Sequence, residues 1–530
     1  MTSVLFRTNA GKKSGLGHLT RCLELARELE RQGAFCSFAI DTIEESIADF
    51  IGSFTTHCLY DSPPDSLNER EDAKKFLHIC ASKKIDWIIV DDYRIAQEWE
   101  NLVSAKGYKI CVIDDLERCH TCDALIDMKW CGPKTESRYE GKVPAHCKKM
   151  LGPQYALLNR TYKNQTPEKC DTFNIMLSLG GSGDLNILNN LINPLKKALP
   201  SAHIYALIGP LSLGKDKFIA EFTKDDFVTP LVGITDIYPY LKHTHLFIGA
   251  AGGTLYQIRA LNIPAFTFSI ASNQHTNISN LEDIGHHFHI NEIIHDYSKV
   301  ANFAAKIATN YQRIKELGSE ALVPIDACGC QRVCNGLLTG RISPPALRHR
   351  SCVETTLSVE HTLRPCIDKD INHYLNSRNL PANRQNMTSV SEINRIDHFC
   401  WWFDAKRENF LLKKKGKPCL YIWHEQIMFE QLSFLVGGWF VCSEQTDFQD
   451  ALIALNWQLE HCDKINPDVP WIAVINKHNK YVKLMNDYVG FKEIDPHHPY
   501  YQATANYFKD ADPKEFHYVI REPQAQASTS

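Results

Sequence analysis

The chain has 530 residues, a formal net charge of −4 and 44% hydrophobic residues. This length is too great for one hydrophobic core, so we expect about three domains. The small net charge excludes an electrostatic bias toward nucleic acid or an anionic membrane surface. The sequence has no run of eighteen apolar residues and no charged-then-apolar leader. We therefore expect a cytoplasmic protein that has no membrane span.

The nineteen cysteines lack the even spacing of a disulfide scaffold, and many stand inside apolar runs. Reduced thiols in hydrophobic cores are the better interpretation. The segments Cys119-His120-Thr121-Cys122 and Cys328-Gly329-Cys330 do not form the two paired spacings that tetrahedral zinc sites favour. The sequence therefore predicts no metal site.

Strand-like apolar runs alternate with amphipathic helical stretches as far as about residue 340. We expect strands at 3–7, 35–40, 86–90, 109–113, 173–179, 203–208, 245–249 and 264–269, and helices at 18–32, 69–82, 184–198 and 254–261. This alternation predicts an α/β fold in which parallel sheets are covered on both faces. The length favours two Rossmann-like domains, 1–165 and 166–340, separated by a polar stretch and followed by a proline-containing linker, 341–357.

His18 stands on a glycine turn between the first strand and the first helix, in the stretch Gly15-Leu16-Gly17-His18. A neutral imidazole is the best general base for water near pH 7. Its place on a turn predicts that the side chain faces a cleft. The alternative is a histidine that only caps the helix.

Two further glycine turns follow strands, Gly180-Gly181-Ser182-Gly183 and the stretch with Gly249, Gly252 and Gly253. Glycine lets backbone amides approach a phosphate, and a helix N-terminus adds partial positive charge. Ligands of open α/β sheets bind at the carboxyl ends of the strands, so two such sheets could enclose a nucleotide diphosphate. None of the turns is a Walker or dinucleotide fingerprint, which disfavours ATP hydrolysis and NAD chemistry.

The motifs "SGLGHLTRCLELA", "LGGSGD" and "GAAGGTLYQIRALNIPAFTFSIASNQ", with "VDDYR" and "MLGPQYALLNRTY", resemble the UDP-sugar hydrolases of pseudaminic acid biosynthesis (the PseG family). That family is similar to glycosyltransferases of the GT-B fold, and the resemblance covers residues 1 to about 335. It implies that water attacks the anomeric carbon of UDP-2,4-diacetamido-2,4,6-trideoxy-β-L-altropyranose and releases UDP. His18 would be the base, and no cofactor would be needed.

The glycine turns and the resemblance together mark the residues expected to bind the nucleotide sugar: Gly15, Gly17, Asp91, Tyr93, Gly180, Gly181, Ser182, Gly249, Gly252, Gly253, Thr254, Gln257, Asn273 and Gln274. The amides of Asn273 and Gln274 suit two acetamido groups. Asp91 and Tyr93 match the loop that lines the sugar, although they could equally be ordinary strand-end residues. Gln257 replaces the family's ribose-binding glutamate, which predicts weaker nucleotide binding.

Residues 358–521 resemble an acetyltransferase of the GNAT superfamily, through the "LRP" start, the "HFCWWF" helix and the module from Asn479 to Gly490-Phe491. The pyrophosphate loop of that family corresponds here to "FVCSEQTDFQD", which contains acids but no glycine, lysine or arginine. The general-acid tyrosine corresponds to Asn486, which cannot protonate a thiolate. Two interpretations stay open: a domain that packs or assembles the protein, or a divergent transferase that uses acetyl-CoA. Residues 522–530 are expected to be disordered.

The leading functional prediction is a UDP-sugar hydrolase of nonulosonic acid synthesis whose only partner is a UDP-activated small-molecule sugar. The alternatives are a bifunctional acetyltransferase and hydrolase, a GT-B glycosyltransferase, and a non-catalytic nucleotide-sugar binding protein. The sequence lacks a basic, aromatic N-terminal helix for docking a lipid acceptor, which disfavours the glycosyltransferase. The oligomeric state is left open.

Overall fold

The structure is a computed structural model of the chain. It describes residues 2–11, 16–43, 48, 51–64, 66–165, 167–168, 170–181, 183–209, 212–234, 236–270, 277–342, 347 and 353–523. The chain divides into two compact units, Met1–His349 and Arg350–Ser530, which are treated separately below. None of the helices in the described ranges is long and apolar enough to cross a bilayer.

The N-terminal unit begins with a parallel sheet. Its strands are β1 (Ser3–Thr8), β2 (Phe35–Ile40), β3 (Thr55–Cys58), β4 (Trp87–Asp91), β5 (Lys109–Ile113), β6 (Ala124–Asp127) and β7 (Lys148–Leu151). They lie in the order β3-β2-β1-β4-β5-β6-β7, and each neighbouring pair is parallel. The strand order reverses between β1 and β4. Such a switch point is where open α/β sheets bind their ligands.

Helices cover both faces of this first sheet. Along β1, Val4 and Phe6 pack in a core with helix α1 (Gly17–Arg31), whereas Leu5 points to the opposite core, with α3 (Glu69–Ala81) and α4 (Gln97–Ser104). The alternation follows from the two-residue period of a strand. Because both faces are buried, the central strands are almost continuously apolar.

A second parallel sheet follows in the same unit. Its strands are β8 (Asn174–Ser178), β9 (His203–Ile208), β10 (Val228–Val232), β11 (Leu246–Ala250), β12 (Ala265–Phe268) and β13 (Phe288–Ile290). Its helices are α5 (Asn186–Ala198), α6 (Lys215–Phe222), α7 (Tyr238–Leu241), α8 (Thr254–Ala260), α9 (Ile278–Asp283), α10 (Tyr297–Thr309) and α11 (Tyr311–Ser319). The order β10-β9-β8-β11-β12-β13 places the switch point of this sheet between β8 and β11.

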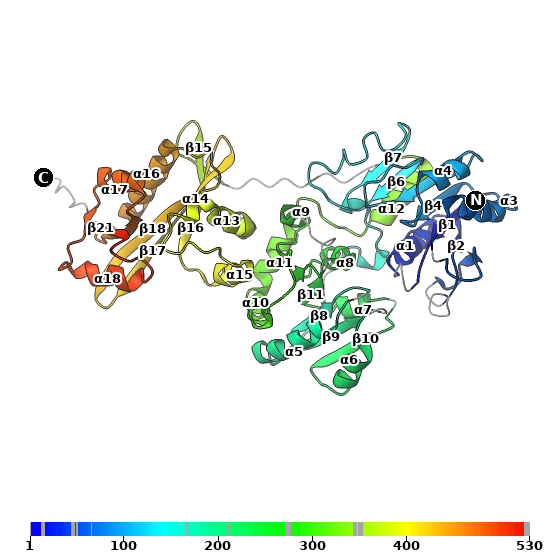
Figure 1. The fold of residues 1–530 in the computed structure, drawn as a ribbon, viewed down its shortest axis with the longest axis horizontal. Helices are drawn as coiled ribbons and strands as arrows, with labels where there is room; N and C mark the ends of the chain where they lie inside the picture. Colours follow the sequence, from blue (N-terminus) through cyan, green and yellow to red (C-terminus); the bar gives the residue numbers. More distant parts are fainter. Residues whose placement is uncertain are drawn as a thin grey trace. The chain divides into compact units, whose positions relative to one another are not determined.

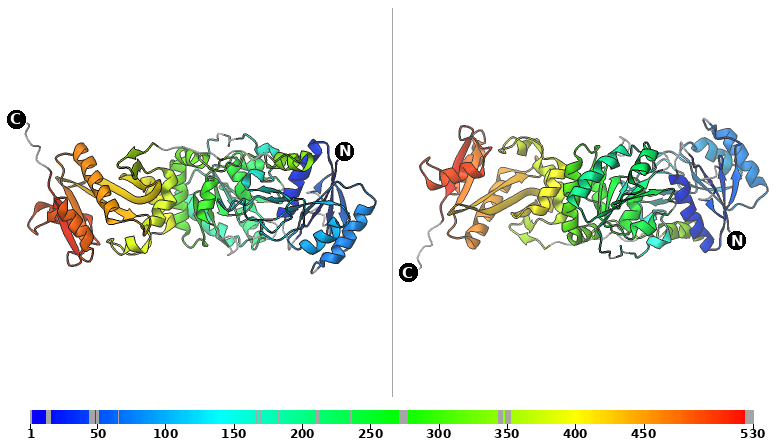
Figure 2. Two further views of the ribbon diagram at one scale, coloured as in Figure 1. Left: turned by 90° about the horizontal axis from the view of Figure 1, so that it is seen from above. Right: turned by 90° about the horizontal axis from the view of Figure 1, so that it is seen from below.

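The chain then returns to the first sheet. Helix α12 (Gly329–Thr339) contributes Cys330, Val333, Cys334 and Leu337 to the core beneath α1, and it lies beside the blue and cyan strands (Figure 1, Figure 2). The crossing is close, because a Cβ atom on Gly329 would lie 2.1 Å from the carbonyl oxygen of Ala156. The core on one face of the first sheet is therefore completed by a helix that follows the second sheet in the sequence.

The C-terminal unit has a mostly antiparallel sheet. Its strands are β14 (Thr355–Thr356), β15 (His361–Pro365), β16 (Glu408–Lys414), β17 (Lys417–Phe429), β18 (Leu432–Val441), β19 (Trp471–Asn476), β20 (Lys492–Glu493) and β21 (Phe516–Arg521), in the order β14-β15-β16-β17-β18-β19-β21-β20. Its α-helices are α13 (Ile371–Arg378), α14 (Pro381–Arg384), α15 (Arg395–Asp404), α16 (Phe448–Ile465), α17 (Lys480–Tyr488) and α18 (Pro499–Tyr507).

The parallel strands β18 and β19 of this sheet are paired over only two residues each. Their register joins Leu435 to Trp471 and Val436 to Ile472. Beyond these pairs, residues of both strands line a cavity of about 800 Å³. The predicted fold class, α/β with two Rossmann-like domains and a further C-terminal α/β domain, is confirmed by the three sheets.

Candidate functional site

His18 lies in the first turn of α1, directly after the carboxyl end of β1. The N-cap position of α1 is Leu16, and no side chain makes a capping hydrogen bond there. The His18 side chain instead turns to the neighbouring strand, where its Nδ1 lies 2.6 Å from Oδ1 of Asp91. The alternative role as a helix cap therefore has no support in the described contacts.

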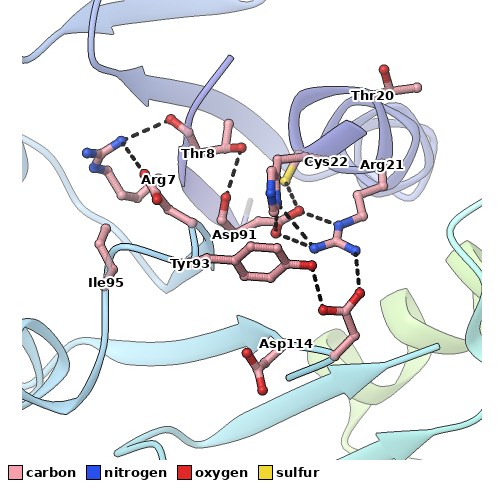
Figure 3. A network of polar contacts seen from close by, with 12 residues as sticks. Arg7, Thr8, Thr20, Arg21, Cys22, Asp91, Tyr93, Ile95 and Asp114 are labelled. Carbon is pink, nitrogen blue, oxygen red and sulfur yellow. Dashed lines mark hydrogen bonds and ion pairs between the residues drawn. The ribbon is translucent and has the colours of Figure 1, made fainter. Parts of the chain in front are cut away.

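Asp91 ends β4, which pairs with β1 on the other side of the switch point. Its carboxylate is fully buried and accepts two hydrogen bonds from Arg21, from Nε and Nη2, each 2.6 Å long. Figure 3 shows the Arg21 guanidinium beside this carboxylate. Burial alone would raise the pKa of Asp91, but Arg21 and His18 outweigh it and lower the pKa to about 2. Asp91 is therefore ionised at neutral pH.

An ionised Asp91 fixes the tautomer of His18. Because the carboxylate can only accept, Nδ1 of His18 must carry the proton, and Nε2 keeps its lone pair. The guanidinium of Arg21 lies 3.3 Å from the same Nδ1 and compensates the carboxylate's charge. The imidazole is thus oriented by the ion pair of Asp91 and Arg21, whose net charge is zero. It can accept a proton at Nε2.

Tyr93 and Asp115 form a second layer around this group. The Tyr93 ring meets the His18 ring edge-on, with centroids 4.5 Å apart and planes at 85°. Its hydroxyl donates to Asp115, whose carboxylate lies 3.9 Å from Nη1 of Arg21. Burial and Asp115 raise the pKa of Tyr93, so the phenol stays protonated. Tyr93 is 39% exposed, so part of the residue is accessible to a ligand.

The glycines of the second sheet fall into two groups. Gly249 is required by packing, because a Cβ atom there would lie 1.9 Å from the carbonyl oxygen of Ser178. Gly181, Gly252 and Gly253 are exposed and lack this restraint, since an added Cβ would meet nothing within 4 Å and their backbone needs no positive φ. Their amides lie at the carboxyl ends of β8 and β11, on the two sides of the second switch point. The Gly252 amide donates to the carbonyl oxygen of Ala250 at 3.0 Å, so Gly181 and Gly253 carry the amides that suit the close approach of a phosphate.

Two further glycines, Gly180 and Gly17, lie at the turns that follow β8 and β1. Gly180 has a φ of 80°, a left-handed conformation that favours glycine. Gly17 opens α1 and would tolerate a Cβ, with nothing within 4 Å. Both are exposed at strand-to-helix turns.

Tyr256 connects the glycine turn of Gly249, Gly252 and Gly253 to the first sheet. It lies on α8, and its hydroxyl donates to the carbonyl oxygen of Met128, one residue after β6, at 2.9 Å. Burial raises the pKa of this phenol, and the nearby carboxylates of Asp127 and Asp115 add to the effect. Thr254 and Gln257, half-buried on the same helix, therefore belong to the element that reaches the carboxyl edge of the first sheet.

The structure brings together His18, Asp91 and Tyr93. Both oxygens of Asp91 are buried and hydrogen-bonded to Arg21 and His18. Arg21 and Asp115 were not predicted. The signal for Arg21 was available, since it follows His18 by three residues on one helix face. The predicted residues Gly15, Ser182, Asn273 and Gln274 lie outside the described residues.

At the start of α16 in the C-terminal unit, two aspartate side chains hydrogen-bond to backbone amides of the helix N-terminus. Asp447 accepts from the amide of Asp450, and Asp450 accepts from the amide of Asp447, each at 3.0 Å. Lys414 donates to both carboxylates, and His361 lies 2.8 Å from Oδ1 of Asp450. The amides of Asp447 and Asp450 are therefore taken by carboxylates, whose negative charge repels a phosphate group.

The cavity between β18 and β19 is lined mainly by aromatic and aliphatic side chains, with Glu444 and Asp447 on its wall. Its described lining contains no lysine, arginine or histidine. Asn486 lines it too and donates to the carbonyl oxygen of Val482. The cavity thus offers no cation to a phosphate group.

Comparison with known proteins gives one relative of interest by sequence. UDP-2,4-diacetamido-2,4,6-trideoxy-β-L-altropyranose hydrolase of Campylobacter jejuni is 27% identical over 223 residues, which are 42% of this chain and 74% of the relative. No protein-family model matches the chain.

Solved structures similar to the chain include MurG of Acinetobacter baumannii, with 15% identity, a TM-score of 0.44, and coverage of 64% of this chain and 100% of that one. UDP-GlcNAc 2-epimerase of Neisseria meningitidis bound to UDP-GlcNAc has 10% identity, a TM-score of 0.44 and the same two coverages. Scores of this size add nothing to the fold that the strand order itself establishes. By sequence, the N-terminal region of the chain resembles this UDP-2,4-diacetamido-2,4,6-trideoxy-β-L-altropyranose hydrolase.

Proposed function

We propose that the N-terminal unit is a UDP-sugar hydrolase with His18 as the general base. The observation that carries this proposal is the His18–Asp91 hydrogen bond at the switch point of the first sheet. The likeness to the Campylobacter hydrolase supports UDP-2,4-diacetamido-2,4,6-trideoxy-β-L-altropyranose, or a close diacetamido sugar, as the substrate. We also propose a GT-B-type pairing of the two sheets, with the nucleotide held by the second.

The reaction begins with a water molecule hydrogen-bonded to Nε2 of His18. As its oxygen attacks the anomeric carbon, Nε2 takes a proton from the water. The bond from the anomeric carbon to the phosphate oxygen breaks, and UDP leaves with the electron pair. The buried Asp91 carboxylate stabilises the imidazolium formed at His18 through the proton on Nδ1. A positioned base of this kind contributes about 10²- to 10⁴-fold to the rate.

The leaving diphosphate gains negative charge, which the open amides of the second sheet can meet. Gly181 and Gly253 supply such amides on the two sides of its switch point. Preorganised backbone donors stabilise developing charge without a metal ion. Gln257 is proposed to hold the ribose, and Asn273 with Gln274 the acetamido groups.

The test is the release of UDP from a panel of UDP-diacetamido sugars, with water as the sole acceptor and products identified by NMR. His18→Asn should lower kcat by roughly 10²-fold or more and leave UDP affinity nearly unchanged. His78→Asn is the matched control, because His78 is exposed on α3 of the same domain. Wild-type turnover in the His18 variant would remove this residue from the mechanism. A sugar transferred to an added acceptor, with no release in water, would instead indicate a glycosyltransferase.

For the C-terminal unit we propose that the GNAT-like domain does not bind acetyl-CoA. The support is the carboxylate-closed N-terminus of α16, together with a cavity whose described lining lacks a basic side chain. Phosphates that meet neither amides nor cations stay better solvated in water. The residues therefore do not fit the pyrophosphate of this substrate.

Calorimetric titration of the full chain should show no saturable binding of acetyl-CoA at sub-millimolar concentration. The hydrolase activity should be the same with and without it. A micromolar dissociation constant, or acetylation of the 4-amino precursor sugar nucleotide, would contradict the proposal and indicate a two-step enzyme.

A further inference from the structure

A cluster of two histidines and a glutamate lies on the C-terminal sheet, apart from the residues assigned above. Glu408 on β16 and His424 on β17 are cross-strand partners, and Nε2 of His424 lies 2.9 Å from Oε2 of Glu408. His461 reaches them from α16. One donor atom from each residue lies within 4.8 Å of the donor atoms of the other two. Three rigid elements thus bring these side chains to one point.

Two ring nitrogens of this cluster are buried without a hydrogen-bond partner in the described part of the chain, Nδ1 of His424 and Nε2 of His461. Buried polar atoms of native proteins nearly always have a partner, so an unpaired one calls for a missing water or ion. An ion bound among the three side chains would supply the missing partner of Nε2 of His461.

Aromatic stacking holds both imidazoles in place. His424 stacks on Phe410, with centroids 5.5 Å apart and planes at 18°, and His461 stacks on Trp457 at 4.8 Å and 17°. Phe410 and Trp457 also contact each other, with centroids 4.8 Å apart. The rings are therefore positioned by packing, as the ligands of a binding site must be.

The carboxylate of the cluster can adjust its position to an ion. Glu408 is largely exposed, with 59% of its side-chain surface accessible, so its carboxylate can rotate toward an ion.

We propose that Glu408, His424 and His461 bind a divalent transition-metal ion, with Zn²⁺ as the fitting occupant. Two histidines and one glutamate form a donor set that zinc uses with water in the fourth position. Ligand atoms of one tetrahedral zinc ion lie roughly 3.3 Å apart, so the cluster closes by about an ångström or more on binding. The ion replaces the hydrogen bond between Glu408 and His424 and ties α16 to the two strands.

The experiment uses the full-length protein, stripped with a chelator under reducing conditions and titrated with Co²⁺ alone. The proposed site should give the visible d–d bands of four-coordinate cobalt without the near-ultraviolet band of thiolate ligation. Glu408→Gln and His461→Phe should each abolish these bands. The phenylalanine keeps the ring that stacks on Trp457, and the glutamine changes only an exposed side chain.

A matched control is Glu493→Gln. Glu493 also pairs with a histidine on this sheet, His517, at 2.6 Å, and its side chain is 57% accessible, but no third ligand joins it among the described residues. This variant should keep the cobalt bands and the rise in thermal midpoint caused by Zn²⁺, whereas both cluster variants should lose them. Equal cobalt spectra and equal zinc shifts in all four proteins, or thiolate bands alone, would overturn the proposal.

Discussion

Replacing Asp91 with asparagine removes the charge that orients the proposed base and leaves the shape of the side chain nearly unchanged. Asp91 contributes to stability because its pKa is about 2 in the folded protein, against 3.8 as the ordinary value. The difference between these two values corresponds to about 2 kcal/mol at neutral pH. The group is fully buried, so solvent does not screen this contribution.

The sign of the pH dependence follows from the lowered pKa. The contribution of Asp91 is fully present above pH 3.8 and is lost as the pH falls toward 2. The variant also leaves Arg21 as a buried cation without its carboxylate, and breaking such pairs costs about 3–5 kcal/mol. We therefore expect Asp91→Asn to lower the free energy of unfolding by roughly 3 kcal/mol at pH 7.

The Asp91→Asn substitution should also lower kcat, independently of its effect on stability. An asparagine can donate to Nδ1 of His18, which favours the tautomer whose lone pair lies on Nδ1 and whose proton blocks Nε2. We expect kcat to fall by about 10²- to 10³-fold, within the range that a general base supplies. Denaturant unfolding gives the stability change, and UDP release gives kcat at a temperature where the variant is folded. Loss of stability with unchanged kcat would refute the orienting role of Asp91.

The other predictions concern the nucleotide, the glycines and one buried histidine. Gln257→Glu should tighten UDP binding by about 1 kcal/mol through a charge-assisted hydrogen bond, and calorimetry showing equal or weaker binding would mean that the ribose is held elsewhere. Gly249→Ala should unfold at lower denaturant, since its Cβ meets Ser178, whereas Gly253→Ala should fold normally and bind UDP more weakly; the opposite pattern would assign the phosphate elsewhere. Burial lowers the pKa of His120, but the nearby buried carboxylates of Asp114 and Glu100 outweigh it and raise the pKa to about 9. The resulting stabilisation, 9 − 6.5 or about 2.5 units and hence about 3 kcal/mol, is full below pH 6.5 and lost as the pH rises through 9, so His120→Gln should flatten the alkaline arm of a stability curve.

The sequence predicted the apolar central strands well, because a strand buried on both faces is a continuous apolar run. The strand predictions at 3–7 and 109–113 nearly coincide with β1 and β5. The edge strand β3 was missed, since Thr55–Cys58 is short, polar and only partly buried. Left-handed Lys415 and Gly416 turn the run 409–424 into the hairpin of β16 and β17.

Among the site residues, too, local patterns were predictable and long-range contacts were not. The glycine turn indicates His18, because a histidine between a strand and a helix is a local pattern. The pairing of His18 with Asp91 spans 73 residues and depends on the parallel register of β1 and β4, which no local pattern contains. The cluster of Glu408, His424 and His461 was missed for the same reason, since two of its partners meet across a hairpin and the third comes from a helix.

The return of α12 to the first sheet has a consequence for folding during synthesis. The core beneath α1 includes Cys330, Val333 and Leu337, so it cannot be completed when residue 165 has left the ribosome. At 5–20 residues per second, roughly 10–35 s pass before residue 339 is made. During that interval α12 cannot yet pack against the core that α1 and β1 share. The first sheet therefore cannot complete this core until the second sheet has been synthesised. A fragment ending near residue 165 should therefore be less resistant to protease than the same residues within a chain that extends to residue 342.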